Sequence, residues 1–401
     1  MTQSDLLTAQ EAARLLGVRA ATLYAYVSRG LIPLAAGEGR ESRYRRSDLL
    51  AWKERRAQGK NPRRAARGSL DFGLPVLESA ITLIEDGRLY YRGIDATELV
   101  ATASLESVAA LIWDVSEREL FTAERMPQLP GSYDSIKPAL DALPFLERAQ
   151  GLLALAGSYD TQAFDRSGLG VAATGVRILR LLLATACGTW PAALPLELQL
   201  ERAWRLGPAA AKVLRAALVL VADHELNPST FAVRTVAATG ATPYACVIAG
   251  LSALSGPLHG GMTARVAAMF DEIGERDPAQ ALGERLRRGE RLPGFGHRLY
   301  PEGDPRAKCL LRLIATSGLP AEVRRAEAIA AAAHRLIGRK PNIDFALVAA
   351  ARALRLPAGA AFMLFTLGRT VGWIGHAIEQ QESGRMLRPR AAYTGPRPTS
   401  R

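Results

Sequence analysis

The chain has 401 residues, of which 48% are hydrophobic and 22% charged, and its formal net charge is +12. These values are those of a globular protein, and the length suggests two or three domains. No apolar run approaches the roughly 18 residues of a membrane span, the start lacks the regions of a signal peptide, and three scattered cysteines exclude a disulfide framework and a zinc site. We therefore expect a cytoplasmic protein without a membrane anchor or a metal.

Most of the basic excess lies at the amino-terminal end, because residues 1–68 carry a net charge of +8 and the other 333 residues only +4. The spacing predicts two short helices there. Thr8 and Glu11 have capping-box spacing, and Gly17 is placed to end the first helix. A second helix is expected from Ala20 to Arg29, which completes a helix-turn-helix pattern.

A basic segment follows this helix pair. It predicts a β-hairpin or wing and then an amphipathic helix opened by Ser47 or Asp48. The region resembles the MerR-like or excisionase-like DNA-binding modules, in which such arginines meet phosphates. A solvated three-helix cap that helps the protein to oligomerise is the alternative. The wing residues are Arg40, Arg43, Tyr44, Arg45 and Arg46.

The sequence divides into three parts on this basis. Residues 1–56 form the helix-turn-helix domain, and residues 57–68, which hold Gly, Pro and four basic residues, form a linker. From residue 69 onward amphipathic helical patterns dominate, so the body is predicted to be mainly α-helical. One exception is SAITLIEDGRLYYRG, whose Asp-Gly pair predicts a hairpin.

Three of the five histidines lie in short, turn-rich contexts, and the other two, His334 and His376, lie within helical patterns where packed or surface roles are expected. A single histidine on a loop is more often a surface residue than a catalyst. His259, in GPLHGG, precedes a helix that should begin near Met262, and there it would stay neutral and donate a hydrogen bond to a developing oxyanion. The remaining two are His224 in DHELNPST and His297 in GFGHRLYPEGDPR.

Charged residues beside turns complete a candidate site. Asp344, in PNIDF, lies near a helix start, where it is either a helix cap or a carboxylate base that works with His259. Arg306, Arg369 and Arg388 each lie beside Gly, Pro or a helix boundary. Guanidinium groups bind carboxylates through two parallel hydrogen bonds, so the combination points to an anionic substrate.

Five blocks of residues 69–395 together resemble the citrate synthases. They are LYYRGIDATELV, DHELNPSTFAVRTVAATG, LSGPLHGG, GFGHRLYPEGDPRA, and NIDFALVA with GRTVGWIGHAIEQ and RPRAAYTG. The resemblance implies a helical fold with a large and a small domain, the small one at roughly residues 262–365, behind a separate helix-turn-helix module. It also implies a homodimer or a higher oligomer.

The resemblance further implies residue roles. His259, His297 and Asp344 would be catalytic, and His297 would contact the oxaloacetate carbonyl. His224, Arg306 and Arg369 would hold the oxaloacetate carboxylates together with Arg388, which would reach in from the partner subunit. The segment expected to lie against the adenine of coenzyme A consists of Leu292, Pro293, Gly294, Phe295 and Gly296.

These roles describe an acyltransferase that condenses acetyl-CoA with oxaloacetate to citrate and needs no cofactor beyond the thioester substrate. Three alternatives stay open: 2-methylcitrate formation from propionyl-CoA, cleavage of a citryl-CoA, and a DNA-binding regulator whose body senses these ligands. The chain departs from the family pattern after GPLHGG, where Met262, Thr263, Ala264 and Arg265 replace a start of Ala-Asn-Glu. This departure leaves the identity of the acyl chain open.

Overall fold

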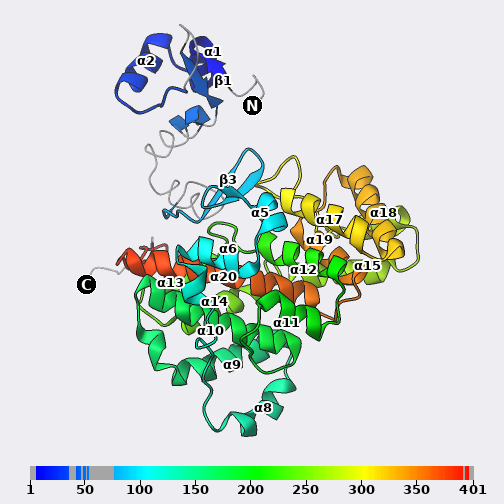
Figure 1. Ribbon diagram of the computed structural model, residues 1–401. Coiled ribbons are helices and arrows are strands. Elements are labelled where there is room, and N and C mark those ends of the chain that lie inside the picture. The colour runs from blue at the N-terminus through cyan, green and yellow to red at the C-terminus, as the bar shows by residue number, and fades with distance from the viewer. Residues whose placement is uncertain are drawn as a thin grey trace. The chain divides into compact units, whose positions relative to one another are not determined.

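The computed structural model describes residues 6–35, 42–46, 48–50, 52–53, 76–391 and 393–396. It divides into two compact units, Met1–Glu78 and Ser79–Arg401 (Figure 1). The predicted linker, residues 57–68, lies outside the described residues, so the division into domains made from the sequence stays a prediction.

The first unit contains the predicted helix pair. Glu11 N–H donates to the Thr8 hydroxyl at 3.3 Å and Thr8 N–H donates to the Glu11 carboxylate at 2.9 Å, so the capping box is confirmed. Gly17 ends the first helix with a φ of +65°, a left-handed conformation that glycine adopts without strain. The elements are β1 (Leu6–Thr8), α1 (Ala9–Leu16), α2 (Ala20–Ser28) and β2 (Arg43–Arg45).

The basic wing has a strand partner that the prediction did not name. Arg43–Arg45 runs antiparallel to Leu6–Thr8 at the start of the chain, and Arg43 also forms an antiparallel bridge with Ala35, as a local hairpin would. Strand alternation explains the pairing, because it buries Tyr44 completely in the core of the unit and leaves Arg45 exposed. Arg40 and Ser47 lie outside the described residues.

The second unit begins with a small antiparallel sheet in the order β3-β4-β5. Its first two strands are joined by Asp86 and Gly87, which both have positive φ angles, as a two-residue hairpin turn requires. The predicted hairpin is therefore confirmed. The strands are β3 (Thr82–Glu85), β4 (Arg88–Tyr91) and β5 (Ile94–Asp95).

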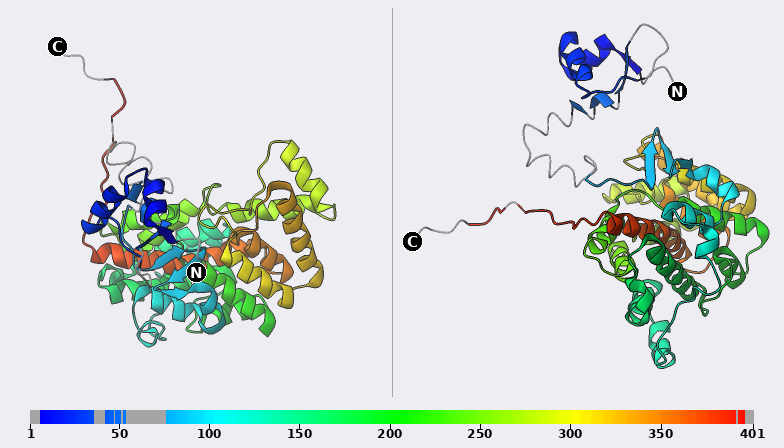
Figure 2. Two further views of the ribbon diagram at one scale, coloured as in Figure 1. Left: turned by 90° about the horizontal axis from the view of Figure 1, so that it is seen from above. Right: turned by 60° about the vertical axis from the view of Figure 1, so that its left-hand side comes forward.

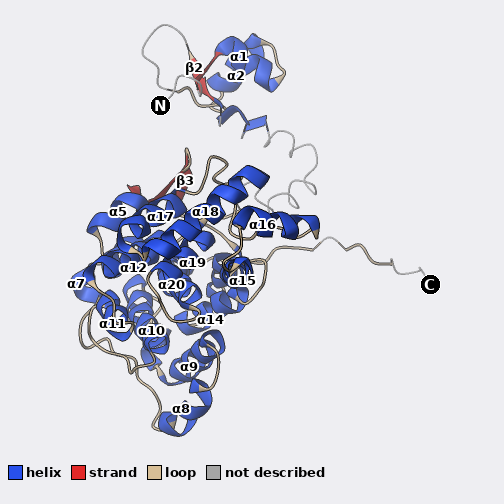
Figure 3. Ribbon diagram, turned by 90° about the vertical axis from the view of Figure 1, so that its right-hand side faces the viewer, coloured by secondary structure: helices blue, strands red, loops and turns tan. Residues whose placement is uncertain are grey.

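Helices form the rest of the second unit, and the prediction of a mainly α-helical body is confirmed (Figure 3). In chain order they are α5 (Ala96–Thr102), α6 (Leu105–Trp113), α7 (Glu117–Leu120), α8 (Tyr133–Asp141), α9 (Phe145–Tyr159), the 3₁₀ helix η1 (Thr161–Phe164), α10 (Gly168–Cys187), α11 (Leu196–Ala203), α12 (Pro208–Leu220), α13 (Pro228–Ala237), α14 (Pro243–Leu254), α15 (Met262–Ile273), α16 (Pro278–Arg287), α17 (Pro305–Ser317), α18 (Pro320–Ile337), α19 (Ile343–Ala353) and α20 (Ala360–Glu382).

Helix α20 is the centre of this unit, where it packs against α6, α10, α12, α13, α14 and α19 (Figure 2). Two of its glycines allow the chain around the end of α12 to approach closely. A Cβ atom on Gly368 would lie 2.5 Å from the Leu218 carbonyl oxygen, and one on Gly372 would lie 2.4 Å from that of Ala222. Any larger residue would push the two segments apart.

Helix α10 is long and apolar enough to cross a membrane by length and composition, contrary to the expectation that no apolar run would suffice. The two arginines inside it are buried, and both have partners. Arg177 contacts the Asp160 carboxylate at 2.6 Å, and Arg180 donates to the carbonyls of Thr122 and Arg125. Since 89% of the apolar stretch is buried, α10 is a core helix of this unit.

Candidate active site

Most of the predicted site residues lie at helix ends in one region of the second unit. His224 follows α12, and His259 lies just before α15, which begins at Met262 as predicted. His297 lies in the loop before α17, and Arg306 and Asp344 occupy the first turns of α17 and α19. Arg369 comes instead from the interior of α20. His224 and His297 are in direct ring contact, His259 and Arg369 both pack against Phe365, and the charges of Arg306 and Arg369 act on Asp344.

His224 and His297 lie against one another around a tyrosine. Their ring centroids are 5.0 Å apart, and His224 Nε2 lies 3.1 Å from the Tyr300 hydroxyl. Leu299 N–H donates to Nδ1 of His297 at 3.2 Å, so the neutral His297 ring carries its proton on Nε2. Burial and the nearby Arg306 guanidinium lower the pKa of both histidines, that of His297 to about 4. Sequence reasoning missed Tyr300.

Arg306 is held by a carboxylate that the sequence analysis also missed. Two nitrogens of its guanidinium contact the two oxygens of Asp304 at 2.8 and 2.9 Å. Asp304 also caps α17 through Arg306 N–H and accepts the N–H of Ile343 at 3.0 Å. It therefore ties together the helix starts that carry Arg306 and Asp344. An Asp-Pro pair at a helix start is the signal that could have revealed it.

Backbone pairing brings His297 and Asp344 together. Gly296 N–H donates to the Lys340 carbonyl at 2.8 Å, and Asn342 N–H donates to the Gly294 carbonyl at 2.9 Å. Gly294 has a φ of +84°, and a Cβ atom there would lie 2.8 Å from Val266 and 3.1 Å from Phe345. The glycines of GFG are thus required for chain packing, and residues 292–295 are buried.

Asp344 does not cap its helix. Asn342 is the N-cap of α19 and accepts the N–H groups of Asp344 and Phe345 at 3.1 and 3.3 Å. The interpretation of Asp344 as a simple helix cap is therefore wrong. Burial raises its pKa to about 6, although the Arg306 guanidinium acts in the opposite direction. A carboxyl group with this pKa is suited to act as a general base near neutral pH.

His259 is oriented by a serine. Its Nε2 lies 2.9 Å from the Ser229 hydroxyl, which also lies 2.7 Å from Asn227 Oδ1 and accepts the Trp373 indole N–H. Burial and the positive charge of Arg369 lower the pKa of His259 to about 4, so the ring is neutral. The serine hydroxyl donates its one proton to Asn227 Oδ1, so it accepts a hydrogen bond from the Nε2–H of the neutral His259 ring.

Arg369 is a buried cation, only 2% exposed. Its Nε donates to the Val221 carbonyl at 2.9 Å, and its guanidinium lies 4.8 Å from the centre of the Phe365 ring. Burial lowers its pKa, and the Arg306 charge acts in the same direction. Among the described residues its two terminal nitrogens have no hydrogen-bond partner, so an anion bound there would satisfy them.

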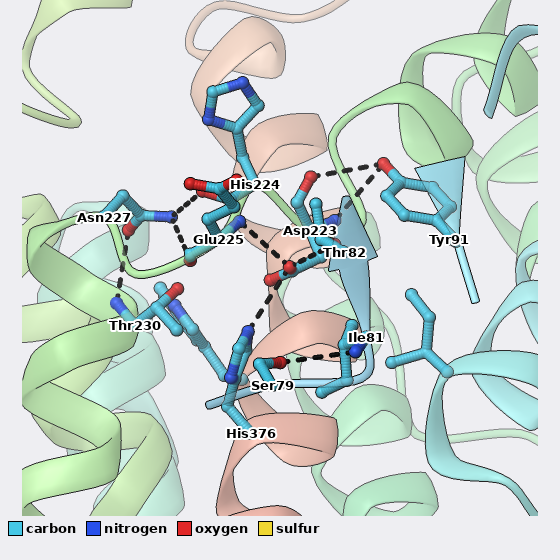
Figure 4. Close-up of polar contacts among 12 residues, drawn as sticks. Ser79, Ile81, Thr82, Tyr91, Asp223, His224, Glu225, Asn227, Thr230 and His376 are labelled. Atoms are coloured by element: carbon cyan, nitrogen blue, oxygen red, sulfur yellow. Dashed lines mark hydrogen bonds and ion pairs between the residues drawn. The ribbon is translucent and has the colours of Figure 1, made fainter. Parts of the chain in front are cut away.

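A second buried network lies directly behind His224, around Asp223 (Figure 4). The Asp223 carboxylate accepts the Thr82 hydroxyl at 2.6 Å and the Glu225 N–H at 3.1 Å, and it lies 3.3 Å from His376 Nε2. His376 is completely buried, in line with the packed role expected for it. Sequence reasoning missed Asp223, although it is the residue before His224.

Arg388 is the one predicted site residue that the structure does not bring to the group within this chain. It is exposed in the coil that follows α20. This C-terminal coil extends away from the rest of the second unit (Figure 2).

The residues after GPLHGG, which depart from the family pattern, still form the start of a helix. Helix α15 begins at Met262, and the Thr263 hydroxyl donates to the Gly260 carbonyl at 3.3 Å.

Two family models match the chain. Residues 72–390 match the citrate synthase C-terminal domain, and residues 6–57 match a helix-turn-helix domain. A putative citrate synthase 2 of Mycobacterium tuberculosis is 33% identical over 337 residues, which cover 79% of this chain and 89% of the relative. Citrate synthase 2 of Bacillus subtilis is 30% identical over 360 residues, which cover 81% and 95%.

The fold is also similar to solved structures. One is the ternary complex of citrate synthase from the archaeon Thermoplasma acidophilum with carboxymethyl coenzyme A and oxaloacetate. It aligns with a TM-score of 0.69 and 26% identity, covering 82% of this chain and 96% of that one.

Proposed function

Because the chain belongs to the citrate synthase family, it is an enzyme of the citrate synthase type, and we propose that it condenses acetyl-CoA with oxaloacetate to give citrate and free CoA. The observation that carries this proposal is the joint presence of two buried arginines, two neutral histidines and a carboxyl group of raised pKa in one site. Citrate synthases need no metal or further cofactor, and the CoA thioester is a substrate.

The arginines bind oxaloacetate in this proposal. Arg369 offers its terminal nitrogens to one carboxylate, and Arg306 contributes the nitrogen that Asp304 leaves free. His224 adds a third contact from the opposite loop. Arg388 completes the site from a second copy of the chain, which accounts for its exposed position and makes the active form a homodimer.

Asp344 removes a proton from the methyl group of acetyl-CoA. This step is difficult for a carboxylate in water, but the pKa of about 6 makes Asp344 a stronger base than an ordinary aspartate. His259 donates a hydrogen bond to the thioester oxygen, where negative charge develops. The segment Leu292–Gly296 lies against the coenzyme. The product of the step is an enolate that can act as a carbon nucleophile, with the methyl proton on Asp344.

The enolate carbon attacks the ketone of oxaloacetate, the thioester carbonyl re-forms, and the π electrons of the ketone become an alkoxide. His297, with its proton on Nε2, donates a hydrogen bond to this alkoxide or protonates it. The citryl-CoA that forms is then hydrolysed, with water breaking the thioester bond to release citrate and CoA. Exclusion of water before this last step protects both the enolate and the thioester.

The first unit binds DNA in our proposal and adds a second role to the same chain. It matches a helix-turn-helix model, and Arg19, Arg29 and Arg45 are exposed around α2 and β2. Exposed arginines next to a helix of this kind suit contacts with phosphates. Residues 1–56 would make these contacts, and the enzyme would work in the cytoplasm.

The test of the enzymatic proposal is release of free CoA by the purified full-length protein. Oxaloacetate is supplied with acetyl-CoA in one assay and with propionyl-CoA in the other, and we expect turnover with acetyl-CoA to be the faster. Faster turnover with propionyl-CoA would reassign the acyl substrate. Binding of oxaloacetate without CoA release from either thioester would overturn the proposal.

The test of DNA binding uses the full chain and a labelled duplex at about 50 mM salt. We expect binding that weakens when Arg19 and Arg45 are replaced by alanine. Exposed Arg276 of the second unit, replaced in the same way, provides the control. Lack of binding by the wild-type chain at low salt would remove the nucleic-acid role.

A further inference from the structure

The segment that carries His224 is attached to α20 at three successive residues. Arg369 Nε donates to the Val221 carbonyl, Gly372 N–H donates to the Ala222 carbonyl at 2.9 Å, and His376 Nε2 lies 3.3 Å from the Asp223 carboxylate. The three residues of α20 lie three and four positions apart, so they share one face of the helix. The helix that supplies Arg369 therefore also fixes the backbone next to His224.

Asp223 is the residue of this segment with the most contacts to other elements. Its carboxylate is fully buried and accepts from Thr82 of β3 at 2.6 Å. Its backbone N–H donates to the Tyr91 hydroxyl of β4, which in turn donates to the carbonyls of Val219 and Asp223. The sheet and α20 thus hold Asp223 from two sides (Figure 4).

The same carboxylate stabilises an unfavourable backbone conformation beside His224. Glu225 has a φ of +51°, in the left-handed region that residues with a side chain rarely adopt. Its N–H donates to Asp223 Oδ2 at 3.1 Å. His224 lies between these two residues, so loss of the carboxylate would free the peptide on both sides of the imidazole. Strained residues of this kind persist only where their surroundings fix them.

His376 is held in turn on its other side. Its Nδ1 lies 3.3 Å from Arg234, which contacts Glu379 at 2.9 Å, and Glu379 accepts the Ala80 N–H at 2.7 Å. The imidazole therefore lies in a fixed row of buried or half-buried charges. These contacts hold the His376 ring in place, so its contact with Asp223 restrains the loop that carries His224.

We propose that Asp223 and His376 are positioning residues for substrate binding, which act through His224 and Arg369 on the keto acid. Neither is a catalytic residue, because each contacts the groups behind the site and not the site itself. The inference rests on the proposed function, since it names oxaloacetate as the ligand that the positioned residues hold.

Another buried aspartate in this chain provides a matched control. Asp160 contacts Arg177 at 2.6 Å, accepts the Tyr244 hydroxyl at 3.0 Å and accepts the N–H two residues further on, at Gln162. Asp223 likewise has a basic partner, a hydroxyl donor and the N–H two residues on. None of the predicted site residues lies on η1, α10 or α14, the elements around Asp160.

The experiment compares Asp223→Ala with Asp160→Ala in the full-length protein. We expect both to lower the melting temperature to a similar extent. Only Asp223→Ala should raise the KM for oxaloacetate, by about tenfold or more, with the KM for acetyl-CoA changed less than about twofold. Asp223→Asn keeps an accepting oxygen in place and should restore most of the oxaloacetate affinity.

Equal effects of the two alanine variants on the KM for oxaloacetate would overturn the positioning role. If Asp223→Ala does not fold, Thr82→Val and His376→Gln take its place, and a KM for oxaloacetate equal to that of wild type in both would overturn it as well. A wild-type chain that neither binds oxaloacetate nor releases CoA would overturn the proposed function together with the inference. If the wild-type chain releases CoA but Asp223→Ala has no specific effect on the KM for oxaloacetate, only the positioning role fails and the proposed function stands.

Discussion

In the first unit the arginines around α2 and β2, Arg19, Arg29 and Arg45, are exposed, whereas in the second unit Arg306 and Arg369 are each 2% exposed. The two groups carry the same charge in different surroundings. An exposed guanidinium is already solvated and gains little from a single anion. A buried guanidinium has lost its water, so it depends on partners such as the Asp304 carboxylate or the Val221 carbonyl.

This difference in exposure suits the two kinds of ligand that we propose. Exposed arginines act by their number, on a long polyanion whose binding releases counterions. Buried arginines act through fixed geometry, on a small anion that fits their remaining hydrogen bonds. The net charge of +12 is therefore not informative about the active site. Most of the excess of basic residues lies in residues 1–68, before the second unit begins.

The largest expected effect concerns Asp344, the proposed base of the reaction. Asp344→Asn should lower kcat by about 10³-fold or more, because the amide cannot take the methyl proton. Oxaloacetate binding, measured by calorimetry, should stay close to that of wild type, since no predicted carboxylate contact is removed. Turnover within about tenfold of wild type would show that another group is the base.

The stability of this variant serves as its control. The raised pKa of Asp344 means that its protonated form stabilises the fold below about pH 4, and that this contribution is lost as the pH rises through about 6. At pH 7 the asparagine variant should therefore be more stable than wild type, on the order of 2 kcal/mol. A melting temperature at or above that of wild type shows that the loss of kcat is not caused by unfolding.

The next effect sharpens the contrast between the arginines. Arg369→Lys keeps the charge but removes the paired nitrogens, so we expect the KM for oxaloacetate to rise by about 10- to 100-fold. The same replacement at exposed Arg45 should leave this KM unchanged and weaken DNA binding only slightly. Steady-state kinetics with oxaloacetate varied at saturating acetyl-CoA measures both. Similar KM values for the two variants would contradict the distinction between buried and exposed arginines.

The sequence predicted those parts of the site that local patterns reveal. Glycine, proline and capping signals placed His259, Arg306 and Asp344 at helix starts, whereas Arg369, expected beside a glycine or a helix boundary, lies in the interior of α20. Asp304 and Asp223 could not be found in this way, since their roles depend on partners distant in sequence, such as Ile343 at 39 positions and His376 at 153. Burial of a charge is a property of the assembled core, and no local pattern records it.

A similar limit explains the strand pairing of the first unit. The basic segment predicted a β-hairpin or wing, but nothing in its sequence identifies Leu6–Thr8 as a strand partner of Arg43–Arg45. Pairing between distant strands is decided by which apolar faces meet in the core, here those of Tyr44 and the residues around it. The helix pair was predicted correctly because its capping box and its glycine stop are local.

The pH dependence of the reaction tests the burial of the proposed catalytic groups. We expect kcat/KM to fall about tenfold for each pH unit below about 6, as Asp344 of the free enzyme becomes protonated. His259 and His297 stay neutral over this range because burial holds the pKa of each at about 4. A kcat/KM profile with one apparent pKa near 6 fits this assignment. A profile that is flat down to pH 5 would show that Asp344 is not the group whose ionisation limits the reaction.

Of the predicted changes, salt concentration should have the smallest effect on oxaloacetate binding. It should also distinguish the ligand binding of the two units most clearly. Between 50 and 200 mM KCl, DNA affinity should fall on the order of 100-fold if about four phosphates are contacted, because each contact releases counterions. The KM for oxaloacetate should change by less than about threefold, since buried charges are screened much less than exposed ones. Both constants are measured on the same full-length preparation. A KM that rises as steeply as the DNA dissociation constant would mean that exposed arginines bind the keto acid, and the assignment of Arg306 and Arg369 would fail with it.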